Sequence, residues 1–231
     1  MTRHLPRSLG CRIATLALVP LLASCGGLLS SPPERQLYRL DPTIVFAAPL
    51  PHVAAQLVIA MPTAPAALDT ERIALSRSPV SLDYLADSQW PDRLSAVVQT
   101  ALVDGFQKSA AIPAVGPESL GLRADFVLET AIRDFEAIYD SPGATPRISV
   151  TLDVQLVRMP ERRIVARISV SREAKAAANS APEMVLAFNS ALGEAITEVV
   201  TWTLGNRALS ERHGSVLSRT RFVHALGSGR L

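Results

Sequence analysis

Apolar and polar side chains alternate strictly between residues 148 and 156, and this pattern constrains the fold more than any other segment. Successive side chains of a strand point to opposite faces of a sheet. The alternation therefore predicts a strand with one buried and one solvated face, an arrangement typical of antiparallel sheets. The apolar positions are Ile148, Val150, Leu152, Val154 and Leu156.

Two neighbouring segments share this period and predict the partners of that strand. Residues 126–132 alternate with one parity and Phe135 falls on the other, so we expect a β-bulge near Arg133 and Asp134. Residues 164–170 alternate again after a turn at residues 160–161. The three strands predict an antiparallel meander. Shorter strands are predicted over residues 37–40, 56–60, 72–77 and 80–85.

Two further segments have helical period. From Trp90 to Lys108 the apolar residues form one stripe, with Pro91 in the first turn and Asp92 at the positive helix end. The second helix begins at a capping-box pattern, Ser180 to Glu183, and ends before a glycine at position 205. Residues 113–117 are predicted as a connection. We expect an α+β fold: a mixed, mostly antiparallel sheet with two amphipathic helices on one face.

The amino terminus has the three parts of a bacterial lipoprotein signal. Basic residues precede the apolar run 13–22, and the box 22–25 closes on Cys25. This order predicts a signal peptide over residues 1–24 and diacylglycerol and acyl (palmitate-type) modification of Cys25. The alternatives are a soluble secreted protein cut nearby and an uncleaved anchor. The run is shorter than the ~20 residues of a membrane span, and it contains Pro20.

Composition divides the remaining chain into three parts. Residues 25–36 form a Ser/Pro/Gly-rich tether, residues 37–204 the domain, and residues 205–231 a basic tail predicted to be disordered. Residues 25–204 together have a mildly acidic net charge, which argues against nucleic acid as a partner. The tail has net charge +4, from Arg207, Arg212, Arg219, Arg221 and Arg230 against Glu211.

The sequence offers little catalytic chemistry. The predicted domain has one histidine, His52, in a loop flanked by prolines, and no cysteine follows Cys25. Without a ligand set, nucleophile motif or phosphate loop, we expect no metal, no cofactor and no enzymatic activity. Trp90 is interpreted as a core residue rather than part of a binding site. An acidic cluster could perform acid–base chemistry, but the wet face of a strand is the favoured interpretation: Glu129, Asp134, Glu136 and Asp140.

The order of several short segments resembles the ABC-type transport auxiliary lipoprotein family, which includes proteins of the paraquat-inducible protein C type. The resemblance covers about residues 37–204. After the lipobox at Cys25, it rests on residues 38–40, 57–60, 68–69, 72–75, 80–84, 90–94, 124–128, Phe135 and 183–184.

This resemblance implies a non-enzymatic component of a lipid-transport system. Its partner would be a mammalian-cell-entry protein that spans the periplasm. The lipoprotein would sit at the outer membrane, in some cases as a homo-oligomeric ring, and would receive the end of that protein. Gly26 directly after Cys25 fits outer-membrane sorting. Two alternatives stay open: a structural or cell-wall-associated envelope lipoprotein, and a lipid-anchored hydrolase that uses the acidic cluster.

Removal of the anchor thiol tests the lipoprotein prediction. We expect Cys25→Ala to release the protein from the membrane fraction, because alanine has no thiol to carry the diacylglycerol. Stable attachment needs several acyl chains, since one chain holds only weakly. Labelled palmitate should enter the wild-type chain and not the variant. Absence of label from the wild type would contradict the prediction.

Overall fold

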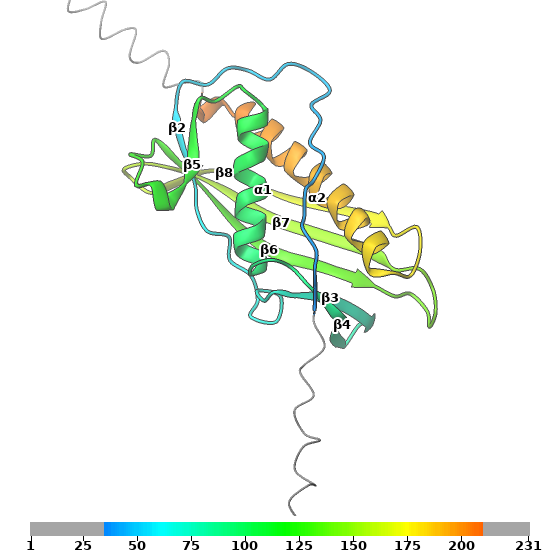
Figure 1. Cartoon of the computed structure of the whole chain (residues 1–231). Helices are drawn as coiled ribbons and strands as arrows, with labels where there is room; N and C mark the ends of the chain where they lie inside the picture. Colours follow the sequence, from blue (N-terminus) through cyan, green and yellow to red (C-terminus); the bar gives the residue numbers. More distant parts are fainter. Residues whose placement is uncertain (1–34, 210–231) are drawn as a thin grey trace, which may run out of the picture. The chain divides into compact units, whose positions relative to one another are not determined.

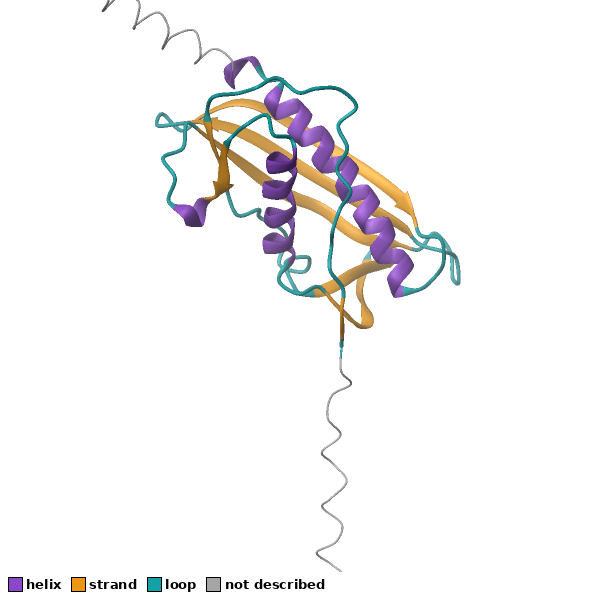
Figure 2. Ribbon diagram, turned by 45° about the horizontal axis from the view of Figure 1, so that its top comes forward, coloured by secondary structure: helices purple, strands orange, loops and turns teal. Residues whose placement is uncertain are grey.

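The computed structural model describes residues 35–209, in which an eight-stranded sheet carries two helices on one face (Figure 1, Figure 2). The signal peptide, Cys25, most of the predicted tether and residues 210–231 lie outside the described residues. The elements in chain order are β1 (Gln36–Leu37), β2 (Gln56–Ile59), β3 (Arg72–Ser78), β4 (Ser81–Gln89), α1 (Leu94–Lys108), β5 (Ala114–Pro117), η2 (Glu118–Leu120), β6 (Phe126–Ile138), β7 (Arg147–Arg158), β8 (Arg163–Lys175) and α2 (Ala181–Leu204).

The predicted antiparallel meander is confirmed. β6 pairs with β7 along its whole length, and β7 pairs with β8, with Leu128 opposite Leu156 and Leu152 opposite Val170. The pairing shifts by one residue between Ile132 and Asp134. This is the predicted bulge, and it turns Phe135 onto the buried face of the sheet.

The second edge of β6 is shared by two groups of short strands. Near its start β6 pairs in parallel with β2, which pairs with β5. Near its end β6 pairs in parallel with β3, and β4 and β1 follow. Thr63 pairs with the part of β6 that lies between β2 and β3. Its N–H donates to the Thr130 carbonyl (2.9 Å), and its carbonyl accepts the Ile132 N–H (2.7 Å). The sheet is therefore mixed, as predicted, although its long strands are antiparallel.

Two strand predictions were wrong in detail. Residues 113–117 were expected as a connection, but residues 114–117 form β5, parallel to β2 with Gly116 opposite Val58. Pro113 precedes β5 and Pro117 is its last residue. Prolines are compatible with an edge strand, because the outer edge of such a strand needs no backbone N–H donors. The first strand is only Gln36–Leu37 rather than residues 37–40. After Tyr38, whose N–H donates to the Gln89 carbonyl (2.9 Å), the chain leaves the sheet.

The first helix begins at Leu94, later than predicted. Trp90 directly follows β4, and its N–H donates to the Glu71 carbonyl (2.7 Å), so Pro91 and Asp92 precede the helix. The free N–H groups of its first turn are satisfied by a distant loop. Asp69 Oδ1 accepts from Ser95 (3.1 Å), and the Thr70 carbonyl accepts from Leu94 (3.2 Å).

The second helix has the predicted bounds but not the predicted caps. Ser180 is the residue before the helix, yet its hydroxyl makes no capping hydrogen bond. Gly205 follows the helix with φ −77°, so it is not in the left-handed conformation that favours glycine at this position. The chain makes a further turn, and Leu209 is 2% exposed. Residues 206–209 therefore belong to the folded domain and not to the tail.

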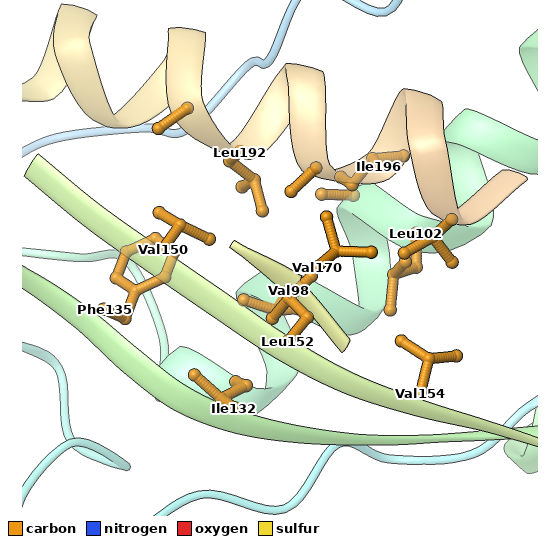
Figure 3. Packing of buried hydrophobic residues seen from close by; sticks show 14 of the residues in the cluster. Val98, Leu102, Ile132, Phe135, Val150, Leu152, Val154, Val170, Leu192 and Ile196 are labelled. Carbon is orange, nitrogen blue, oxygen red and sulfur yellow. The ribbon is translucent and has the colours of Figure 1, made fainter. Parts of the chain in front are cut away.

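The core lies between the helices and the sheet (Figure 3). Three aromatic rings join its parts: Trp90 meets Phe188 edge-on (5.4 Å between ring centroids), and Phe188 stacks on Phe135 (4.9 Å). Around them pack fully buried aliphatic side chains from α1, α2 and the meander: Val98, Leu102, Ile132, Val150, Leu152, Val154, Val170, Leu192 and Ile196. Although α2 is long and apolar enough to span a membrane, 61% of its most apolar window is buried in the domain. It is a core helix.

Residues 38–50, here called the strap, cross the outer side of the two helices on their way from β1 to β2 (Figure 2). The strap is held to α2 by a hydrogen bond from Asp41 N–H to Asn189 Oδ1 (2.8 Å). It passes so close that a Cβ atom at Gly193 would lie 2.4 Å from the Thr43 carbonyl oxygen. The strap therefore forms a third layer over α2.

We expect Gly193→Ala to destabilise the domain by about 1–3 kcal/mol, because the added methyl overlaps backbone atoms that no rotamer change can move. The same substitution at an unobstructed helix position would stabilise by up to about 1 kcal/mol. Urea unfolding measures the change, with Ser190→Ala on the exposed side of the same helix as control. A stability gain for Gly193→Ala would contradict the close contact of the strap.

Candidate functional site

The residues considered for catalysis lie in different parts of the domain: His52 in a loop, Trp90 in the core and the acidic cluster along one face of the sheet. His52 is exposed in the loop that follows the strap. Across residues 35–209, no three His, Cys, Asp or Glu side chains are close enough to hold a metal ion. Trp90 is 1% exposed and packs in the core. These positions therefore give no basis for an active site in the described part of the chain.

The acidic cluster lies along the solvated face of the meander. Glu129, Asp134 and Glu136 lie on the outward face of β6, opposite Gln155, Thr151 and Ser149 of β7. Asp140 follows the strand and forms an ion pair with Arg147 (3.6 Å). Other ion pairs cross the same face, from Arg133 to Asp153 (2.6 Å) and from Arg147 to Glu173 (2.6 Å). This geometry agrees with the favoured interpretation, in which the acidic side chains lie on the solvated face of the sheet.

Two carboxyl groups on this face have shifted pKa values of opposite sign. Partial burial raises the pKa of Glu136 above its ordinary value, and the nearby Asp134 carboxylate adds to this while Arg147 opposes it. The pKa of Asp153 is lowered by hydrogen bonds from Ser169 Oγ (2.7 Å) and Arg133 Nε (2.6 Å). Both shifts follow from local packing and pairing on a strand surface.

An open groove of about 930 Å³ runs along the outer side of α2, and we name it the α2 groove. Its floor is the outward stripe of the helix from Leu186 to Trp202. One wall is the strap, including Val45, and the other is the inner side of β8, including Ile168 and Arg172. The site exists because β8 is the edge strand and leaves the flank of α2 uncovered.

The groove combines apolar and ionic side chains. Leu186 is 60% exposed and Val45 is 69% exposed, which is unusual for large apolar residues. Arg172 rises from β8 opposite the buried Val150 and hydrogen bonds with Glu198. Its Nε also lies 3.9 Å from Glu194 Oε2. The guanidinium ties the edge strand to the helix and forms part of the groove surface.

A smaller hollow of about 380 Å³ lies on the other side of the strap, between it and α1. It is lined by charged residues of both signs, among them Arg39, Asp92, Asp104 and Lys108. The strap thus separates two depressions on the helical face of the domain. No sequence pattern predicts either depression, because each is formed by segments far apart in the chain. The only local signal was Leu186, an apolar residue outside the inner stripe of α2.

Residues 38–200 match the family of ABC-type transport auxiliary lipoprotein components, and the chain belongs to this family. The protein is thus the auxiliary lipoprotein component of an ABC-type transport system and is anchored to a membrane of the cell envelope. The family is not an enzyme family. The predicted resemblance is confirmed.

Solved structures show the same fold. Protein XCC0632 from Xanthomonas campestris is 24% identical and superposes with a TM-score of 0.70, covering 78% of this chain and 99% of its own. An uncharacterized protein is 16% identical with a TM-score of 0.57, covering 72% of this chain and 96% of its own. No curated protein matches the chain significantly.

The two shifted carboxyl groups predict opposite pH effects on stability. Because the folded pKa of Glu136 is raised, its ionisation costs stability as the pH rises through that value, so Glu136→Gln should be more stable than wild type at neutral pH. Because the folded pKa of Asp153 is lowered, its stabilising contribution is present at neutral pH and lost in acid. Asp153→Asn should therefore be less stable than wild type at neutral pH.

Urea midpoints at about pH 7 and about pH 3 measure both effects, and both differences should shrink at the lower pH. Equal shifts at the two pH values would contradict the electrostatic origin. Thr151→Ala, on the same face and without a titrating group, is the control.

Proposed function

We propose that this protein docks a mammalian-cell-entry transporter at the outer membrane, held there by acylation of Cys25, with residues 37–204 as the docking domain. The observation that carries the proposal is the family match over residues 38–200. The described domain agrees with it, since the acidic side chains considered for catalysis line the solvated face of β6 and His52 lies in an exposed loop. Energy for transport would come from another subunit, because the chain has no nucleotide-binding motif.

The α2 groove is the surface best suited to bind the transporter. Exposed apolar side chains such as Leu186 and Val45 lose contact with water when a partner covers them, which favours association. Trp202 and Arg172, which also line the groove, are residue types enriched among those that contribute most to binding. The groove is open along its length, so an extended segment or a helix of the partner can enter it.

Crosslinking and affinity purification from detergent extracts test this assignment. The wild-type lipoprotein should recover a mammalian-cell-entry protein, and Leu186→Asp should reduce the affinity about tenfold or more by placing a charge in the contact. The matched control is Val80→Asp, because Val80 is 96% exposed in the turn between β3 and β4, away from the groove. Recovery of no such protein with the wild type would overturn the proposal. Retention on cell-wall polymer instead would favour the structural envelope lipoprotein.

A further inference from the structure

The α2 groove has a net negative charge as well as exposed apolar side chains. Asp41, Glu194 and Glu198 line it, and among residues 35–209 Arg172 is the one cation in its lining. Both glutamates form ion pairs with the single guanidinium of Arg172. The charge of Asp41 and part of the glutamate charge therefore stay uncompensated within the groove. A segment that alternates apolar and cationic side chains would complement such a surface.

The chain itself continues from one end of this groove. Shortly after Trp202, the buried Leu209 and a hydrogen bond from Arg158 Nη2 to the Ala208 carbonyl (3.3 Å) fix the last described turn to the domain. Residues 210–231 then carry four arginines against one glutamate. They also include large apolar side chains: Val216, Leu217, Phe222, Val223 and Leu226.

The length of this segment is sufficient. The floor from Leu186 to Trp202 is about 24 Å long, at ~1.5 Å per helical residue. Residues 210–231 can extend to roughly 70 Å at ~3.3 Å per residue, so they can return along the whole groove. Because the two are parts of one chain, the effective concentration of the segment at the groove is on the order of millimolar, and weak contacts suffice.

We propose that residues 210–231 bind in the α2 groove, with arginines near Asp41 and Glu194 and apolar side chains on Leu186 and Val45. The segment and a docked partner would then use the same side chains of the α2 groove. The occupancy of the groove by the segment does not depend on the proposed function.

The groove contains its own reporter. Trp202 lines it, whereas Trp90, the other tryptophan, is 1% exposed and inaccessible to a quencher. The experiment measures acrylamide quenching of tryptophan fluorescence in the mature chain, made soluble by Cys25→Ser. We expect Trp202 to be protected in the intact chain. In the double variant Arg219→Glu, Arg221→Glu, quenching should rise to the value of a chain that ends at Leu209.

Three controls make the result specific. Trp202→Phe should abolish the quenchable component. Arg163→Glu, a charge reversal at an exposed position at the start of β8, should leave the protection unchanged. Leu186→Asp should remove the protection, and thermal unfolding should show that the domain stays folded. High salt should also reduce the protection by screening the arginines.

Equal quenching of the intact and shortened chains would overturn the proposal. Protection that disappears on dilution would also overturn it, because a second copy of the protein would then be the occupant. These measurements use the lipoprotein alone, so their failure leaves the docking proposal intact, and failure of the affinity purification leaves the occupancy of the groove intact.

Discussion

Pairing of β6 on both edges is the interaction on which the rest of the structure depends. One edge carries the long antiparallel strands β7 and β8, and the other carries two groups of short strands. Phe126, Leu128 and Phe135 of this strand are all buried. Because β6 links all the other strands into one sheet, the helices have one continuous apolar surface to cover. The opposite face stays polar, with cross-strand ion pairs such as Arg133–Asp153.

The strap gives the domain a third layer on the helical side. Its backbone lies against α2 at Gly193, a position where any larger residue would displace it. Ile44 of the strap also lies 3.3 Å from where a Cβ at Gly105 of α1 would be. The strap joins β1, which directly follows the predicted membrane tether, to β2, and it forms one wall of the α2 groove. A small change in its position would therefore alter the groove.

The α2 groove gives the domain an accessible and partly apolar surface. β8 is an edge strand whose inner face carries Arg172 and Ile168 where the neighbouring strand carries Val150 and Val154. The groove arises from this incomplete burial at the sheet edge together with the strap, which forms its second wall. The proposed docking role requires such an accessible, partly apolar surface, and the acidic residues of the groove favour a cationic partner segment.

The sequence by itself determined the meander, its bulge, both helices and the apolar stripes, because strict period-2 and 3.6-residue patterns report burial residue by residue. It also determined the family, through segments spread over the domain. Only the tertiary structure decided where α1 begins, since Asp69 and Thr70 of a distant loop satisfy its first turn. The same is true of β5, which needs β2 beside it, and of the α2 groove, formed by the strap, α2 and β8. These features depend on pairs of residues far apart in the chain, and no local pattern encodes such contacts.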